Sequence, residues 1–379
     1  MNKSAYLGES SIQMLHTWIR DICDPDFICK TILDQIILDQ LVKEGMEIDT
    51  TGIPWMNQLE DIRKNYEKKD GFVRSEHEDG SIFDACFKDK KPHGVIRKMN
   101  GLGDLEFYGC IAYGKLLGVC WKSVPGGGFM ISSNVVFSGP GTIYLYPDCR
   151  LGFSGTFKDC LLVSGLLIEV TGFESDERLQ GSIIRPVTST ISNQEYKMDI
   201  SSSELFSSFP LLAEPYESIF VEVGESRIPG AGQGLFAKVD IAFGTVIGFY
   251  NGHKVAAEHD FDTTSPYRIS LDKDIDLDIP EHLTNLDRYQ ATLGHKVCHS
   301  FDPNSNTDLF LHPRFGLIRC IVTIKNIEAG SEVTINYSYD MTTAPDWYRI
   351  AWAKHQKNVR GLPDWRMAML KSGINIFEK

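Results

Sequence analysis

Two short stretches of this sequence decide the fold. They read Gly294-His295-Lys296-Val297-Cys298-His299-Ser300-Phe301-Asp302-Pro303-Asn304 and, further along the chain, Glu332-Val333-Thr334-Ile335-Asn336-Tyr337-Ser338-Tyr339-Asp340. The first stretch crowds histidine, lysine, cysteine and serine together. The second places Tyr337 and Tyr339 two residues apart, so on a strand they would share one face. Two paired core aromatics are the simplest explanation of that spacing, and a shared binding site is the alternative.

Size and composition describe an ordinary folded protein of two or three domains. The chain has 379 residues, of which 42% are hydrophobic and 23% charged, and its net charge is −13. This charge disfavours direct binding to nucleic acid phosphates and favours a basic partner such as a lysine-rich tail. Met1 to Ser10 lack the features of a secretory signal. No apolar stretch reaches the roughly 18–20 residues of a membrane helix.

Nine dispersed cysteines are typical of reduced thiols in an intracellular protein. Their spacing lacks the close clusters of a structural zinc site, so we expect no metal. A nuclear or cytoplasmic location, or both, is the corresponding expectation. The sequence does not indicate an oligomeric state.

Residues 1–70 are expected to form a helical N-terminal segment, because apolar side chains recur there at helical spacing. These positions are Leu15, Ile19, Ile22, Ile32, Ile36, Leu41, Leu59, Ile62 and Tyr66. Asp24-Pro25-Asp26 indicates a break between two of the helices. Packing or partner binding is the role that we expect for this segment.

Residues 71–175 show a repeat of 23 or 24 residues. Its markers are Gly94, Gly118, Gly141 and Gly165, and three of them follow the aromatic units Phe83–Phe87, Phe107–Ile111 and Phe153–Phe157, whereas Met130 and Asn134 replace the aromatics in the remaining unit. So short a period predicts a stacked array of β-hairpins. We expect the glycines to supply positive φ at the hairpin turns. The units resemble degenerate MORN repeats, and a general Gly-rich β meander is the alternative.

The rest of the chain is predicted to contain a connector, a β domain and a closing helix. Residues 176–215 look like an irregular connector with a serine-rich part. Residues 216–342 alternate short apolar strands with Gly and Pro turns, which is typical of a compact β domain. Residues 343–379 begin with Pro345-Asp346 and then place apolar side chains at helical spacing, so a helix that starts near Asp346 is expected.

A glycine-rich loop, Gly230-Ala231-Gly232-Gln233-Gly234, precedes a predicted strand. Closely spaced glycines allow backbone amides to approach a ligand. For this loop taken alone, a plain hairpin turn is the favoured explanation. The spacing does not fit a dinucleotide-binding fingerprint, and no helix follows.

The crowded stretch from Gly294 to Phe301 permits two chemical interpretations that fail on inspection. A metal site would need a second ligand cluster at suitable spacing. A nucleophilic pair of Cys298 and His299 would need side chains that meet. Neighbouring residues on a strand point to opposite faces, so this pair would not meet.

Taken together, the glycine-rich loop, the His-Ser stretch and the Tyr-x-Tyr-Asp stretch resemble the SET domain of protein-lysine methyltransferases. The resemblance is closest to the MORN-repeat type of SET-domain histone-lysine methyltransferase, and His312-Pro313-Arg314-Phe315-Gly316 and Ser270-Leu271-Asp272 also match that type. It implies a mostly β fold: a hairpin array followed by a SET domain in which the two stretches cross like a knot. It also implies S-adenosylmethionine as the methyl donor.

The resemblance further implies roles for individual residues. Tyr250, Tyr337 and Tyr339 would wall a narrow channel and position the lysine amine as catalytic residues. The implied cofactor-binding residues are Ala231, Gly232, Gln233, Cys298, His299 and Trp347, and the implied substrate-channel residues are Tyr267 and Thr307.

Four positions depart from the pattern of that family. Gln233 replaces an acidic residue, Cys298 an asparagine, Thr307 a channel tyrosine, and Tyr267 a small polar residue. The leading hypothesis is methyl transfer to lysine in histones or other proteins. The alternative is a catalytically weakened SET-domain binding protein whose repeats recruit a partner.

Overall fold

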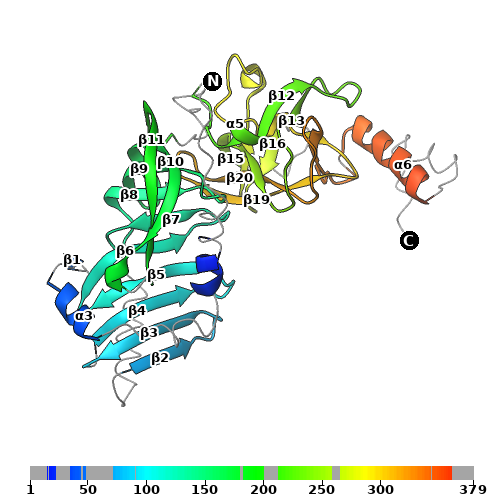
Figure 1. Cartoon of the computed structure of the whole chain (residues 1–379). Helices are drawn as coiled ribbons and strands as arrows, with labels where there is room; N and C mark the ends of the chain where they lie inside the picture. Colours follow the sequence, from blue (N-terminus) through cyan, green and yellow to red (C-terminus); the bar gives the residue numbers. More distant parts are fainter. Residues whose placement is uncertain are drawn as a thin grey trace. The chain divides into compact units, whose positions relative to one another are not determined.

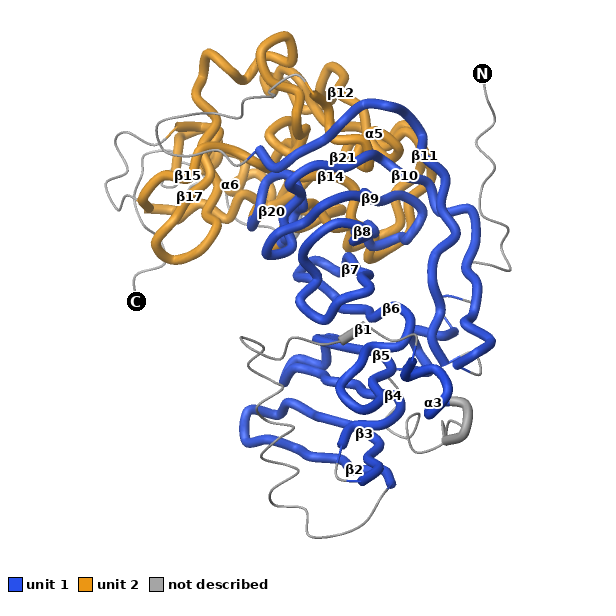
Figure 2. The backbone as a smooth tube through the Cα atoms, turned by 90° about the vertical axis from the view of Figure 1, so that its left-hand side faces the viewer, with its two compact units in different colours: residues 1–200, 310–317 blue, residues 201–309, 318–379 orange. Residues whose placement is uncertain are grey.

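The computed structural model describes residues 15, 17–22, 35–43, 46–47, 71–89, 91–179, 182–199, 212–257, 265–342 and 344–360. β-strand is the commonest regular structure among these residues, as the sequence predicts. They form two compact units, one of residues 1–200 with 310–317 and one of residues 201–309 with 318–379 (Figure 2). The domain limits inferred from the sequence stay predictions.

Unit 1 is built on a sheet in which each strand pairs antiparallel with the next (Figure 1). Its strands are β2 (Gly71–Glu76), β3 (Ile82–Lys88), β4 (Lys91–Met99), β5 (Leu105–Ala112), β6 (Lys115–Ser123), β7 (Phe129–Ser132), β8 (Gly139–Leu145), β9 (Leu151–Lys158), β10 (Leu161–Ser175) and β11 (Ile184–Tyr196). A further short strand, β1 (Met46–Glu47), pairs with β6. The predicted array of hairpins is therefore confirmed, while its assignment to the MORN repeats stays a prediction.

The repeating glycines do not lie where the sequence predicts. Gly94, Gly118 and Gly141 have positive φ but lie inside β4, β6 and β8, near register shifts in the pairing with a neighbouring strand. Two of the tight turns instead use Tyr113-Gly114 and Asp159-Cys160, and all four of these residues have positive φ. These three glycines therefore mark β-bulges, which glycine permits because it lacks a Cβ. The fourth, Gly165, lies inside β10 and has no positive φ.

The expectation of an irregular connector over residues 176–215 is wrong for residues 184–196, which form β11. This strand contains β-branched residues such as Val187, Thr188 and Ile191, which favour extended backbone. A short 3-10 helix, η1 (Glu177–Leu179), precedes β11. The serine-rich part of the predicted connector lies outside the described residues.

The described parts of the N-terminal segment include helical residues 17–22 and the helix α3 (Gln35–Leu41). The segment is not wholly helical, since β1 also lies within it. Trp18 packs against Tyr108 and Trp121, with ring centroids 5.3 and 5.1 Å apart. The expected third helix, near Leu59, lies outside the described residues.

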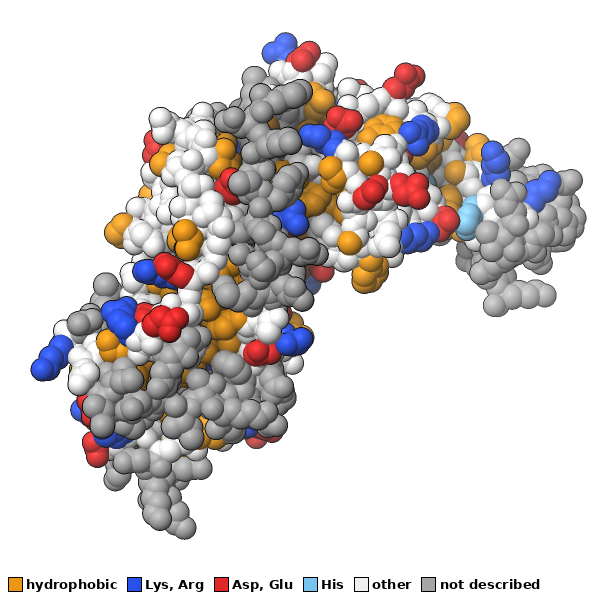
Figure 3. Space-filling model, in the orientation of Figure 1, with side chains coloured by type: hydrophobic (Ala, Val, Ile, Leu, Met, Phe, Trp, Pro, Cys, Tyr) orange, Lys and Arg blue, Asp and Glu red, His pale blue; other side chains and the backbone are white. Residues whose placement is uncertain are grey.

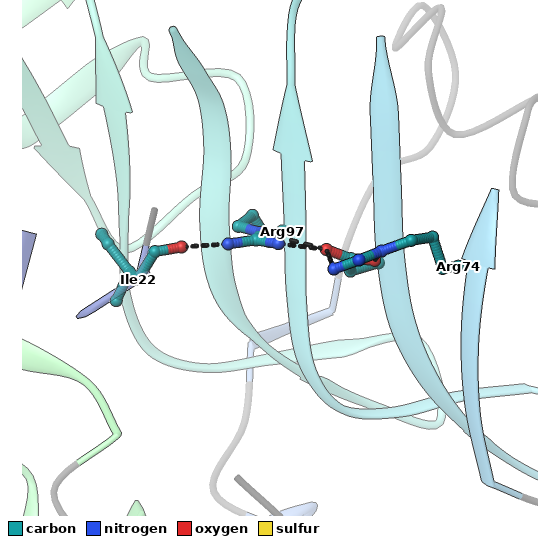
Figure 4. Close-up of polar contacts among 4 residues, drawn as sticks. Ile22, Arg74 and Arg97 are labelled. Carbon is teal, nitrogen blue, oxygen red and sulfur yellow. Dashed lines mark hydrogen bonds and ion pairs between the residues drawn. The ribbon is translucent and has the colours of Figure 1, made fainter. Parts of the chain in front are cut away.

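A buried ionic network lies beneath this segment (Figure 4). Asp84 accepts hydrogen bonds from Arg74 Nε at 2.7 Å and Arg97 Nε at 3.1 Å, and Arg97 Nη1 donates to the carbonyl of Ile22. The side chains of Arg97 and Asp84 are 2% and 0% exposed. The sheet thereby binds the end of residues 17–22 through a charge-assisted hydrogen bond.

Residues 310–317 belong to unit 1 although they are remote from it in sequence. The amide of Leu311 donates to Pro125 O at 2.9 Å, and the amide of Leu162 donates to Pro313 O at 2.9 Å. The Arg314 guanidinium lies over the rings of Tyr196 and Phe315, at 5.3 and 4.7 Å from their centroids. These contacts embed the segment in the array.

The described residues of unit 2 form three small sheets, of which one includes β19 and β20, two strands that continue into residues 310–317 of unit 1. Their strand orders are β12-β13-β21-β18, β14-β20-β19 and β15-β17-β16. The bounds are β12 (Val221–Glu225), β13 (Gln233–Ala237), β14 (Val246–Tyr250), β15 (His253–Ala256), β16 (Arg268–Ser270), β17 (Ile275–Asp278), β18 (Cys298–His299), β19 (Ser305–His312), β20 (Gly316–Thr323) and β21 (Glu332–Ile335). The helices are α5 (Glu217–Phe220), η3 (Glu281–Leu283), η4 (Gly294–Lys296) and α6 (Asp346–Arg360).

The core of unit 2 joins strands from different sheets, with Val221, Leu235, Ile247, Ile321 and Val333 among its buried members. Burial of these apolar side chains holds the short strands together. The predicted closing helix is confirmed as α6, which begins at Asp346.

Candidate active site

The stretches 294–304 and 332–340 lie side by side in the structure. β18 pairs parallel with β21, with Cys298 opposite Thr334 and His299 opposite Ile335. The amide of Ser300 then donates to Ile335 O at 2.9 Å. This pairing brings residues 298–300 against the segment that leads to the two tyrosines. The knot-like threading of one segment through the other stays a prediction.

Tyr337 is tied to the His-Ser stretch at both ends. Its amide donates to His299 Nδ1 at 3.2 Å, and its hydroxyl donates to the carbonyl of Val297 at 2.8 Å. Because Nδ1 accepts, neutral His299 carries its proton on Nε2. Burial lowers the pKa of His299 to about 4, so the ring is neutral near pH 7.

The expectation that Tyr337 and Tyr339 share a face of one strand is wrong. β21 ends at Ile335, and Ser338 between the tyrosines has a φ of +52°. This left-handed residue turns the backbone, and the two rings meet edge to face with centroids 5.8 Å apart. The tyrosines are therefore brought together by a turn and not by strand periodicity.

Aromatic rings from α6 complete the cluster. Tyr339 lies 6.2 Å from Trp347 and 5.2 Å from Tyr348 between ring centroids, and His299 lies 4.7 Å from Tyr348. Trp347 is 49% exposed. Tyr348, which the sequence argument missed, is buried in this cluster and directly follows Trp347, and that adjacency on a helix is the signal that could have found it.

Tyr250 lies at the end of β14 and is buried. Its hydroxyl donates to the carbonyl of Tyr267 at 2.6 Å. Burial raises the pKa of Tyr250 well above its usual value, and the nearby Tyr337, Asp278 and Tyr339 raise it further. The phenol is therefore un-ionised at neutral pH and is not a general base.

The glycine-rich loop is anchored at its base and open at its tip. Ser226 Oγ donates to Glu332 Oε1 at 2.5 Å, and the amide of Arg227 donates to Glu332 Oε2 at 2.9 Å. Gly230 and Gly232 have φ of +82° and +74°, and no atom lies within 4 Å of a Cβ placed on either. Glu332 was missed by sequence reasoning because its partners lie about a hundred residues away.

Cys298 lies against the same loop. Its thiol is 3.6 Å from Ser226 Oγ and 3.5 Å from Gln233 O. Burial is the main reason that the pKa of Cys298 is raised. A thiol held in its protonated form is a weak nucleophile, which agrees with the rejection of a Cys–His pair.

The structure does not join all predicted channel residues. Tyr267 contacts Tyr250 through its carbonyl, and its ring lies 6.3 Å from that of His295. Thr307 lies partly buried on β19, where its amide donates to Asn306 Oδ1 at 2.9 Å. No hydrogen bond between Thr307 and the three tyrosines is found among the described residues.

In the part of the chain that the structure describes, no three His, Cys, Asp or Glu side chains are grouped to hold a metal ion. Nor does any helix in that part have the length and apolar character to cross a membrane.

The comparisons with known proteins first define a class. Residues 232–338 match the SET domain family. "Histone-lysine N-methyltransferase SETD7" of Halocynthia roretzi is 37% identical over 266 residues, which cover 65% of this chain and 67% of that protein. The chain therefore belongs to the SET-domain protein-lysine N-methyltransferases, and S-adenosylmethionine is its methyl donor.

A solved structure described as "ctPRC2 in an autoinhibited conformation bound to S-adenosylmethionine" is also similar, with 22% identity and a TM-score of 0.25. That match covers 32% of this chain and 15% of the other.

Proposed function

We propose that this protein methylates lysine side chains of histones or other proteins, with Tyr250, Tyr337 and Tyr339 around the lysine amine. The observation that supports this most is the pairing of β18 with β21, because it gathers His299, Tyr337 and Tyr339 in one cluster. Aromatic walls exclude water and hold the aliphatic part of a lysine. Low solvation also favours the neutral, nucleophilic amine over the ammonium.

The hydroxyl geometry supports the same role for Tyr250 and Tyr337. Tyr250 and Tyr337 donate their protons to main-chain carbonyls. Their oxygens retain lone pairs that can accept hydrogen bonds from a lysine nitrogen. Methyl transfer is then chiefly a matter of alignment, which such contacts provide.

The loop and the aromatic cluster fit the cofactor. The space beside Gly230 and Gly232 admits a ligand close to the backbone, and the half-exposed ring of Trp347 offers a flat surface for an adenine. Ala231, Gly232, Gln233, Cys298, His299 and Trp347 are the residues that we propose hold it. When bound, S-adenosylmethionine supplies a methyl group on a cationic sulfur that leaves as a neutral thioether.

The substrate is proposed to be a lysine-bearing protein, and a histone tail fits because the relative is a histone-lysine methyltransferase. The net charge of −13 favours a basic partner. On the face shown in Figure 3, acidic and basic side chains are interspersed, so charge there does not single out a docking surface. A nuclear or cytoplasmic location stays a prediction.

The test uses the full chain with radiolabelled S-adenosylmethionine, a panel of histones and a cell extract. We expect label on lysine of at least one protein, and loss of that label when Tyr250, Tyr337 and Tyr339 are all changed to Phe. Calorimetry should show that the triple variant still binds the cofactor. Cofactor binding without transfer to any substrate would instead favour the alternative, a catalytically weakened binding protein.

A further inference from the structure

The strand that carries Tyr250 contains a β-bulge. β14 pairs with β20 through Val246 opposite Val322 and Gly248 opposite Ile321, so that Ile247 is an extra residue on β14. Beyond the bulge the pairing continues, and Tyr250 lies opposite Arg319. A shift of one residue moves every later side chain to the other face of a strand. The bulge therefore decides the side from which Tyr250 projects.

A buried carboxylate binds the chain directly after this bulge. Glu217 Oε2 accepts a hydrogen bond of 2.9 Å from the amide of Phe249, the residue directly before Tyr250. Glu217 is 1% exposed. A carboxylate is costly to bury unless it is hydrogen-bonded. The Phe249 amide next to the bulge supplies such a hydrogen bond.

The main chain of Glu217 is itself fixed by hydrogen bonds. Its amide donates to Glu214 Oε2 at 2.9 Å, and the amide of Glu214 donates to Ala291 O at 3.0 Å. Glu217 is the first residue of α5, whose last residue, Phe220, leads directly into β12. The acceptor thus has a defined place, which it can impose on β14.

The carbonyl of Phe249 is constrained by a second segment. A Cβ built on Gly294 would lie 2.5 Å from Phe249 O and 3.0 Å from Tyr250 Cα. Only a glycine permits so close an approach. The peptide groups around Phe249 are therefore contacted both by Glu217 and by the start of η4.

We propose that Glu217 is a positioning residue for methyl transfer: it stabilises the bulge in β14 and thereby places the Tyr250 hydroxyl at the lysine amine. This inference rests on the proposed role of Tyr250. Glu217 touches neither reacting atom and acts through Tyr250 alone. Its effect belongs to catalysis and not to cofactor binding.

Two substitutions in the full chain separate the acceptor from its charge. Glu217→Gln keeps an oxygen that can accept from the Phe249 amide, and we expect kcat within about twofold of the parent. Glu217→Met removes the acceptor at similar size, and we expect kcat to fall about tenfold or more, because small displacements of a positioned group are costly. The cofactor Kd from calorimetry should not change. Glu222→Met, at an exposed position on β12, is the matched control.

A double-mutant cycle with Tyr250→Phe decides whether Glu217 acts through Tyr250. If it does, Glu217→Met should change kcat by less than about twofold once the hydroxyl is absent. Should Glu217→Met not fold, Glu217→Asp takes its place in the cycle, since it shortens the reach of the carboxylate. Additive losses would overturn the inference and leave the proposed function intact. An unchanged kcat in Tyr250→Phe itself would instead remove the proposed role of Tyr250, and the inference with it.

Discussion

The hydroxyl of Tyr250 donates to the main-chain carbonyl of Tyr267 at 2.6 Å. The hydroxyl of Tyr337 is used in the same way at the carbonyl of Val297. Within the described residues, the hydroxyl of Tyr339 has no such partner. The three proposed catalytic tyrosines are therefore not equivalent, and Tyr339 has a hydroxyl whose proton and lone pairs are both available to a substrate.

We expect Tyr339→Phe to lower methyl transfer far more than cofactor binding. Loss of one positioning contact can cost about 10²-fold in rate. Single-turnover rates and calorimetric Kd values for the cofactor measure the two effects separately, with Tyr113→Phe in the hairpin array as control. An unchanged rate with a weaker cofactor affinity would assign Tyr339 to the cofactor.

We expect Trp347→Ala to weaken cofactor binding with little loss of stability. The ring is 49% exposed, so its removal leaves only a shallow defect. Stacking of a base on an aromatic ring contributes about 1–3 kcal/mol, which corresponds to roughly 5- to 150-fold in Kd. Calorimetry and thermal unfolding measure both quantities. The exposed Ile350 on α6 provides the control substitution Ile350→Ala. Equal Kd values for parent and Trp347→Ala would remove the adenine contact.

We expect the wild-type protein to add more than one methyl group, and Thr307→Tyr to restrict it to one. Threonine is smaller than the tyrosine that the resemblance implies here, so a methylated nitrogen has room to turn and present its lone pair again. Mass spectrometry of the product over a long time course distinguishes the methylation states. A wild-type reaction that stops at one methyl with cofactor in excess would contradict this, and Tyr267→Ser would then test whether Tyr267 fills the space.

We expect the free energy of unfolding to fall as the pH falls from about 6.5 towards 4, partly through His295. Burial, and then the neighbouring Lys296, lower its pKa to about 4, against 6.5 for an ordinary histidine. The unfolded chain therefore takes up a proton first, so this contribution is complete above about pH 6.5 and is lost on acidification. Urea unfolding at several pH values gives the free energy of unfolding as a function of pH. This free energy should change less steeply with pH for His295→Gln than for the parent. The exposed His282→Gln is the control, and equal slopes for His295→Gln and the parent would contradict the assignment.

We expect Arg97→Met to destabilise unit 1 by about 3 kcal/mol or more. The change removes the buried positive charge that pairs with Asp84 and the hydrogen-bond donor to the carbonyl of Ile22. Urea unfolding measures the change. Arg20→Met is the control, since Arg20 pairs with Asp21 at the surface and such pairs contribute little. Similar losses in the two variants would show that the network adds nothing to stability.

The sequence carries the features that depend on local pattern. The hairpin array follows from the spacing of glycines such as Gly118, and the open loop from Gly230 and Gly232. What it does not carry depends on tertiary contact or on unusual backbone. Ser338 adopts a positive φ, which its residue type does not predict. Glu217 meets Phe249, thirty-two residues away, only in the folded chain.

The membership of residues 310–317 in unit 1 has a consequence for how such a protein can be inherited or rebuilt. The segment lies inside the range that matches the SET domain, yet it packs within the hairpin array. A single cut between array and SET domain would therefore leave the array without one of its own pieces. An exchange of the array between related proteins must also exchange residues 310–317, which takes two crossover sites more than a simple fusion. Otherwise the recipient must already have a compatible segment at these positions. The array and the SET domain are therefore interleaved along the sequence, and one crossover cannot exchange either of them whole.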